Sequence, residues 1–291
     1  MGVNFSAFFR LHNGSHPPSP PPPPPYPCLG DLSESCVAAV MEYLSPVEIC
    51  KLARLNQAFR AASWADCVWE SKLPLNYRFL VRRVIGDFAP IMSKREIYTR
   101  LCHQNPLDGG NKKFWLDKYS GGVCLSISSM DLRITGIDDR RYWNRISTEE
   151  SRFNTVAYLQ QTWWLEVGGE VDFPLPPGTY SLYFRLQLGQ TSWRFGRKIH
   201  NLEHVHGWNI KPTQFQLWTS DGQHAKTERY LNEAGKWTLH HAGNFHVDAR
   251  NESIRIKFSM TQIDCTHTKG GLCLDSVLIC PVGYDQRSKC R

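Results

Sequence analysis

Short helical patterns occupy the first third of the chain. Ser33 stands before a run in which apolar residues recur three and four positions apart, the spacing of one helix face, and its hydroxyl is suited to cap that helix. Ser45-Pro46-Val47-Glu48 predicts the start of a second helix, with proline in the first turn and a capping box of serine and glutamate. A third helix is predicted from Asn56 through Phe59. The apolar positions of the first run are Val37, Val40, Met41 and Leu44.

A second pattern, with a period of two residues, begins near Lys113. Apolar and polar residues alternate along 180–188 and 254–260, and more briefly along 123–127, as in strands with one buried face. Gly168-Gly169 predicts a two-residue hairpin turn between two such segments. Long helical periods are absent here. The sequence therefore predicts an antiparallel β-sandwich that is jelly-roll-like.

These patterns divide the chain into five segments and predict a multidomain α + β protein. Residues 1–27 are a disordered N-terminus, whose proline-rich stretch predicts an extended spacer or a ligand for a proline-binding module. Residues 28–74 form a small helical unit, and 75–110 form a helical linker with one short helix that begins at a further capping box, Ser93 with Glu96. Residues 111–283 form the β-sandwich, and 284–291 are a tail.

The helical unit predicts a protein partner. A unit of about 45 residues buries too little surface to be comfortably stable alone. Trp64, Trp69 and Leu73 add large apolar area late in the unit. Its spare apolar face is therefore expected to be covered by another protein.

Composition and charge exclude several classes of function. The net charge is +7, but no run of basic residues exceeds two, so we expect no nucleic-acid binding. No span of about 18 apolar residues predicts a transmembrane helix. The ten cysteines lack a paired C-x-x-C arrangement, and the chain shows no secretory signal. Reduced thiols in the cytoplasm, the nucleus or both are therefore expected.

No catalytic or metal-binding motif stands out, so we predict a non-enzyme without a cofactor. Residues 200–206 and 240–246 each hold three histidines, but no cysteine or carboxylate pair completes a metal site. Glu149-Glu150 could suggest paired carboxylates for glycoside hydrolysis. Adjacent strand residues point to opposite faces, however, and could not flank one bond. G-x-S-x-G and phosphate-loop motifs are absent.

The first six residues fit a pattern for lipidation. Met1-Gly2 followed by Ser6 matches the signal for myristoylation of Gly2. A single acyl chain gives only weak, reversible membrane association. The alternative is an unmodified, disordered start to the chain.

Residues 28–74 resemble the F-box family, whose members dock substrate readers onto a ubiquitin-ligase scaffold. The resemblance rests on four segments, Leu29-Gly30-Asp31-Leu32, Leu44-Ser45-Pro46, Ala58-Phe59-Arg60 and Asp66-x-x-Trp69. It implies that a Skp-type adaptor contacts Leu29, Leu32, Pro46, Ile49 and Leu52. Gly30 replaces the family's proline and removes one rigid contact. The alternative is a three-helix unit without a partner.

Residues 111–283 resemble the phloem-protein-two, or Nictaba-type, lectin domain of plants, and the whole chain resembles the F-box proteins of the phloem-protein-two A group. The matching segments include Leu116-Asp117-Lys118-Tyr119-Ser120-Gly121, Tyr142-Trp143, Glu150-Ser151-Arg152-Phe153 and Trp164-Leu165-Glu166-Val167. Members of the lectin family bind N-acetylglucosamine oligomers or N-glycan cores. Such recognition stacks an aromatic face on the sugar while polar groups bond its hydroxyls.

One loop departs from the lectin pattern. Where the family commonly has Trp-Lys-Ser-Gly, this chain has Thr268-Lys269-Gly270-Gly271, without the aromatic residue. Trp193 and Trp208, in the loop-like segment 189–211, are the substitute candidates for carbohydrate binding, together with Lys269. The alternative is that these tryptophans cover the apolar core.

Two functions from different classes follow. The leading prediction is a substrate-recognition subunit of a Skp–cullin–F-box ubiquitin ligase, which reaches cullin through the adaptor. The lectin-like part would select the target protein, and glycoproteins are one candidate class of target. The alternative is a carbohydrate-binding protein whose F-box no longer docks.

Overall fold

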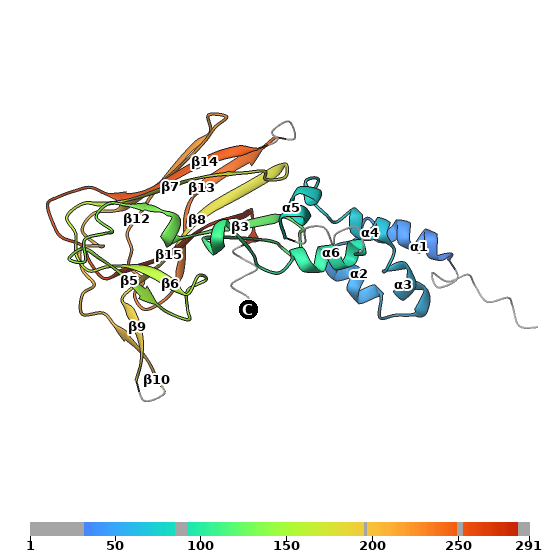
Figure 1. Cartoon of the computed structure of the whole chain (residues 1–291), viewed down its shortest axis with the longest axis horizontal. Coiled ribbons are helices and arrows are strands. Elements are labelled where there is room, and N and C mark those ends of the chain that lie inside the picture. The colour runs from blue at the N-terminus through green and yellow to red at the C-terminus, as the bar shows by residue number, and fades with distance from the viewer. Residues whose placement is uncertain (1–31, 85–91, 195–196, 249–252, 285–291) are drawn as a thin grey trace, which may run out of the picture.

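A computed structural model describes residues 32–84, 92–194, 197–248 and 253–284. Helices gather at one end of the molecule and antiparallel sheets make up the rest (Figure 1). Gly2, the polyproline stretch and residues 285–291 of the tail lie outside the described residues. None of the described helices is long and apolar enough to cross a membrane.

Three helices of the N-terminal part, α1 to α3, begin where the sequence predicts them. Ser33 caps α1, and Ser45 with Glu48 forms the predicted capping box of α2. Asn56 caps α3 by accepting a hydrogen bond from the amide of Phe59. The helices are α1 (Glu34–Met41), α2 (Pro46–Leu52), α3 (Gln57–Ala62), α4 (Asp66–Glu70), α5 (Tyr77–Val84) and α6 (Lys94–Leu101).

The segment predicted to be a linker is packed structure. It contains α5 as well as the expected α6, and strand β1 begins at Asn105. The ring of Tyr98 in α6 lies 5.3 Å from that of Trp69 in α4, and the Trp69 indole donates a hydrogen bond to the Ser63 carbonyl. An aromatic contact therefore joins α4 to α6.

The larger of the two main sheets contains eight strands. β15 lies at its centre, paired along its length with β8 and on its other side with β3 and β6. β2 and β1 extend the sheet beyond β3, β5 follows β6, and β13 follows β8. The strands are β1 (Asn105–Leu107), β2 (Lys112–Leu116), β3 (Val123–Ser128), β5 (Trp143–Ser147), β6 (Thr155–Leu159), β8 (Gly178–Leu188), β13 (Thr238–Val247) and β15 (Leu272–Pro281).

A five-stranded antiparallel sheet packs against the first. Its order is β12-β11-β14-β7-β4, formed by β12 (His224–Arg229), β11 (Thr213–Thr219), β14 (Ile254–Gln262), β7 (Leu165–Phe173) and β4 (Arg133–Ile134). The Phe184 ring of β8 lies 5.4 Å from Phe215 of β11 and 6.0 Å from Phe258 of β14. Because these rings come from both sheets, they form the core between the two layers.

The predicted hairpin turn at Gly168-Gly169 is wrong, because β7 runs through both glycines without a break. Gly169 pairs with Phe258 across the sheet, and a Cβ at Gly169 would lie 2.6 Å from the Phe258 ring. The glycine therefore makes room for an aromatic ring in the core.

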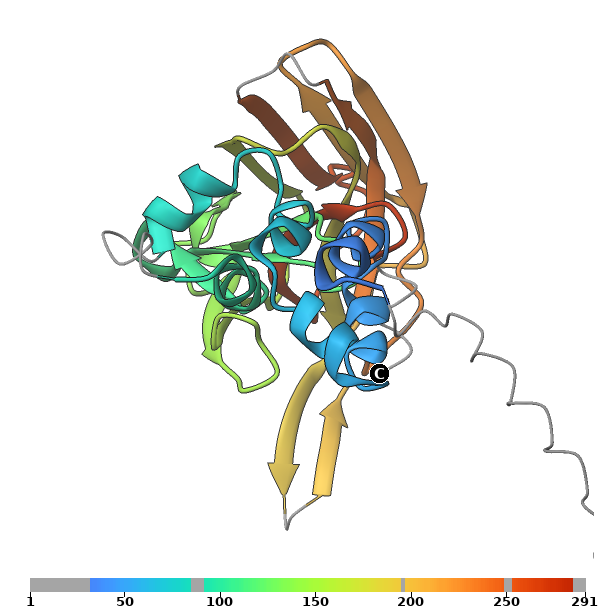
Figure 2. The same cartoon turned by 90° about the vertical axis from the view of Figure 1, so that its right-hand side faces the viewer.

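The segment 189–211, expected to be a loop, contains a hairpin. Strands β9 (Gln190–Arg194) and β10 (Arg197–Asn201) pair with each other and project away from both sheets (Figure 2).

The helical part and the sheets share one apolar core. A single cluster of buried side chains runs from Val37 in α1 to Ile279 in β15. The Asn76 amide donates a hydrogen bond to the Pro174 carbonyl, and a Cβ at Gly121 would lie 2.8 Å from the Lys72 carbonyl oxygen. Direct backbone approach and apolar packing therefore join the two parts.

A buried histidine in β13 predicts pH-dependent stability. The His240 ring stacks on Phe215 at 5.8 Å, and burial lowers its pKa from 6.5 to about 4, with a smaller effect from Arg229. Between these pH values the unfolded chain binds a proton that the folded chain excludes. Stability is therefore full above pH 6.5 and falls toward pH 4.

We expect His240 to contribute a loss of about 2–3 kcal/mol in the free energy of unfolding between about pH 7 and pH 4.5. Urea unfolding of the parent and of His240→Phe at both pH values measures this contribution. The variant should lose less stability on acidification. Equal losses would show that other groups cause the pH dependence.

Candidate functional site

An exposed apolar stripe runs along the outer face of α1. Cys36 and Val40 are four residues apart, so they lie on one side of α1, and Tyr43 follows in the turn just after the helix. Val40 is 52% exposed, Tyr43 is 91% exposed, and Leu32, just before the helix, is 41% exposed. Val37, Ala38 and Met41 occupy the opposite, buried face. We call Leu32, Val40 and Tyr43 the α1 stripe.

The residues expected to face an adaptor lie in different environments. Leu32 is exposed, Leu52 is half-buried, and Leu29 lies outside the described residues. Pro46 is buried, and Ile49 is 0% exposed in the same core cluster as Met41. The prediction that Ile49 and Pro46 contact a partner is therefore corrected, because their side chains pack inward and stabilise the unit.

A groove of about 520 Å³ opens beside the start of β7. Tyr142 and Trp163 line it, and both are partly exposed to solvent. Gln160, Gln161 and His204 supply polar groups. This combination of aromatic faces and hydrogen-bonding groups is suited to a sugar or another polar ligand. We call it the Trp163 groove.

Two of the predicted carbohydrate-binding residues are buried behind this groove. The Lys269 ammonium group donates hydrogen bonds to the carbonyls of Trp163, Gln262 and Asp264, at 2.9, 2.8 and 3.1 Å. Burial lowers the pKa of Lys269. The Trp208 indole donates to the Gly270 carbonyl at 2.7 Å, and its ring is enclosed.

The prediction that Lys269 and Trp208 contact a sugar directly is therefore corrected. Both side chains are buried and support the backbone around the groove. Lys269 bonds the Trp163 carbonyl, and its own backbone pairs with that of Thr162. Trp193 lies in β9, and its side chain is outside what the structure describes.

A signal for the Trp163 groove was present in the sequence. Trp163 and Trp164 are adjacent, so an alternating pattern could bury only one of them. In the structure both precede β7 and both are exposed. The two adjacent tryptophans, which no alternating pattern could bury together, therefore pointed to this groove.

A second groove, of about 760 Å³, lies beside Trp237. Glu149 and Glu150 line it from the turn after β5, which is not the strand position assumed from the sequence. The Glu150 carboxylate accepts a hydrogen bond from the Trp237 indole at 3.0 Å, and the Arg185 guanidinium lies 4.4 Å from the ring centroid. The Trp237 indole ring is thus held by a hydrogen bond at its edge and by the guanidinium group over its face.

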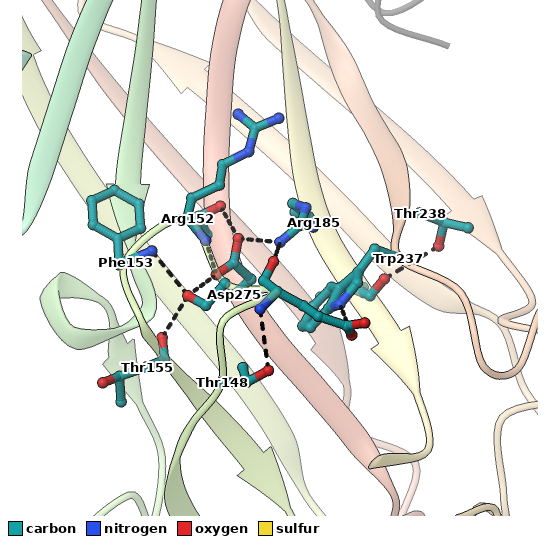
Figure 3. A network of polar contacts seen from close by, with 12 residues as sticks. Thr148, Arg152, Phe153, Thr155, Arg185, Trp237, Thr238 and Asp275 are labelled. Atoms are coloured by element: carbon teal, nitrogen blue, oxygen red, sulfur yellow. Dashed lines mark hydrogen bonds and ion pairs between the residues drawn. The ribbon is translucent and has the colours of Figure 1, made fainter. Parts of the chain in front are cut away.

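A buried carboxylate anchors the loop beside this second groove (Figure 3). Asp275 is fully buried in β15 and accepts hydrogen bonds from the Ser151 hydroxyl at 2.5 Å and the Arg152 amide at 3.2 Å. Its other oxygen pairs with Arg185 at 2.8 Å. Arg185 also donates to the Glu150 carbonyl. We call this arrangement the Asp275 network.

The two groups of histidines do not form a metal site in the described residues. His240 packs on Phe215, whereas His241 packs on Tyr183 and His246 lies beside Thr179. His204 lines the Trp163 groove, and its carbonyl contacts the ring of His206. The residues are thus divided among separate environments.

Comparison with known proteins places this architecture in a family. The phloem protein 2 family matches residues 122–281. The F-box protein PP2-A12 of Arabidopsis thaliana is 59% identical, covering 88% of this chain and 88% of its own. The F-box protein PP2-A11 of the same plant is 58% identical, covering 90% and 91%. The chain is therefore an F-box protein with a phloem protein 2 domain, and it belongs to the plant PP2-A group.

Similarity to solved structures is much weaker. A family 35 carbohydrate binding module from Clostridium thermocellum matches 54% of this chain and 96% of its own, at 10% identity and a TM-score of 0.30. Similarity at that level carries no argument about function. The family assignment indicates no enzymatic family, because the relatives are named F-box proteins.

Proposed function

We propose that this protein is a substrate-recognition subunit of a Skp–cullin–F-box ubiquitin ligase. The observation that carries the proposal is the α1 stripe, because it presents apolar side chains on a small helical unit that belongs to an F-box protein. Exposed apolar patches of this kind are typical of protein interfaces. The stripe would dock a Skp-type adaptor, which would bring cullin.

The β part would select the target. The Trp163 groove offers an aromatic face with neighbouring amide and imidazole groups, the combination that recognises sugar C–H faces and hydroxyls. The lectin family's preference for N-acetylglucosamine makes glycoproteins carrying that sugar the proposed targets, and the lectin-like sandwich is the proposed reader. The cysteines of the described residues are all free thiols, which fits a cytoplasmic or nuclear protein.

Co-expression with a plant Skp adaptor tests the first part of the proposal. We expect the two chains to co-purify and to elute together in size-exclusion chromatography, and addition of cullin should give a ternary complex. Elution of this chain alone, together with sugar binding, would favour a carbohydrate-binding protein that does not dock.

Sugar binding is tested at Trp163. Trp163→Ala should weaken binding of chitotriose by about 1–2 kcal/mol, because stacking and apolar burial are lost. Isothermal titration calorimetry measures the dissociation constant. Trp164→Ala is the matched control, because Trp164 is also exposed but bonds Glu166 and does not line the groove. Equal losses in both variants would place the sugar elsewhere.

A further inference from the structure

A groove on the helical part is lined by three arginines. It has a volume of about 590 Å³ and lies between α2, α3 and α6. Arg54 follows α2, Arg60 belongs to α3, and Arg95 belongs to α6. No carboxylate side chain lines this groove. We call it the arginine groove.

The three guanidinium groups lack acidic partners. In the described part of the chain, no ion pair joins Arg54, Arg60 or Arg95 to an aspartate or glutamate, whereas several other cations are paired. Three unpaired positive charges from three elements therefore meet at one hollow. Each repels the others unless an anion lies between them.

Arg95 is held in an orientation suited to binding a carboxylate. Its guanidinium lies 4.0 Å from the centroid of the Trp64 ring and 5.7 Å from that of Trp69. Stacking on an aromatic face leaves the N–H donors at the edge of the guanidinium plane available for a bidentate contact. It also restricts the side chain before a ligand arrives, which lowers the entropy cost of binding.

A neighbouring hollow extends the positive surface. It has a volume of about 370 Å³, shares Trp64 and Arg95 with the arginine groove, and adds Arg100 and His103. Its one carboxylate, Glu96, is already hydrogen-bonded to the backbone and hydroxyl of Ser93 as part of a helix cap. Arginines spread along two adjacent hollows suit a chain with several negative charges better than a single phosphate.

We propose that the arginine groove binds an acidic peptide segment, rich in aspartate and glutamate, of the target protein. The groove shares no residue with the α1 stripe, although Ile49, one of the adaptor contacts implied by the F-box resemblance, lies in its lining. An adaptor confined to the α1 stripe would leave the arginines of the groove uncovered. Its α6 wall packs into the core that continues into the sheets. Assignment of the acidic segment to a target protein rests on the proposed ligase function, whereas binding of an acidic peptide does not.

The test uses the full chain and a fluorescein-labelled peptide of eight glutamates, with fluorescence anisotropy as the readout. We expect Arg60→Glu with Arg95→Glu to weaken binding at least about ten-fold, the loss of at least 1.4 kcal/mol of charge-assisted contact. Arg82→Glu with Arg83→Glu makes the same change in net charge on exposed positions of α5. This control should change binding less than about two-fold, since these arginines do not line the groove.

A further variant and a further peptide distinguish a specific carboxylate site from diffuse attraction and from a phosphate site. Arg95→Lys keeps the charge but loses the planar fork, so it should weaken binding several-fold while leaving the fold intact. Equal losses in the two double variants would show diffuse attraction to a basic surface and overturn the proposal. A phosphoserine peptide of the same length that binds at least about ten-fold tighter would also overturn it.

Saturating Skp adaptor identifies the source of the acidic segment. We expect the peptide to bind the adaptor complex as tightly as it binds the chain alone. Competition would show that the adaptor occupies the groove and would refute the assignment to the target. Failure of the adaptor to bind the parent chain would instead contradict the ligase function, while leaving peptide binding to be judged separately.

Discussion

Asp275→Ala is expected to lower the free energy of unfolding by about 3–5 kcal/mol, the cost of breaking a buried ion pair. The Asp275 carboxylate is fully buried and accepts from Arg185, Ser151 and the Arg152 amide. Without it, the Arg185 guanidinium keeps its charge but loses its partner. Denaturant unfolding followed by tryptophan fluorescence measures the change.

The control is an exposed ion pair in the other sheet. The Glu170 carboxylate lies 3.9 Å from the Lys257 ammonium group. The Glu170 side chain is 50% exposed and that of Lys257 is 59% exposed. Glu170→Ala should therefore cost no more than about 1 kcal/mol. A loss for Asp275→Ala as small as that of the control would mean that solvent or rearrangement replaces the network.

Replacing Val40 and Tyr43 together with aspartate should weaken adaptor binding at least about 100-fold. The two side chains form most of the α1 stripe, and two carboxylates desolvated at an apolar interface would lack partners. Because both positions are exposed, the helices should remain folded. Surface plasmon resonance with immobilised adaptor measures the affinity.

Leu75→Asp is the matched control for docking. Leu75 is 84% exposed on the same helical part but lies in the segment between α4 and α5 and does not belong to the α1 stripe. The control should bind the adaptor like the parent. Undiminished binding by the Val40 and Tyr43 variant would show that another surface docks, whereas an equal loss in both variants would indicate a general charge effect.

Local signals predicted the helices well because they act within a few residues. Ser33, Ser45, Asn56 and Ser93 each cap the helix expected after them. Strand alternation likewise predicted β14, whose apolar residues face the core while Arg255 and Lys257 face solvent. These features depend on backbone geometry and on one layer of packing.

Features that depend on distant partners were missed. Alternation along β8 predicted one buried face, yet Tyr183 on the other face is also buried, in a cluster with Trp115 and Leu278. Lys269 resembled a ligand-binding residue because no local pattern shows that three carbonyls enclose its ammonium group. Gly169 resembled a turn residue because its neighbour Phe258 is remote in sequence.

The shared core between helices and sheets sets the reach of the proposed ligase. The hydrogen bond from Asn76 to Pro174, the close backbone approach of Gly121 to Lys72 and the shared apolar packing hold the two parts together. A bound target would then stand at a fixed distance and angle from the ubiquitin donor. Selection would extend beyond the recognised sugar or peptide to the position of the target's lysines, because only those within this zone could be modified.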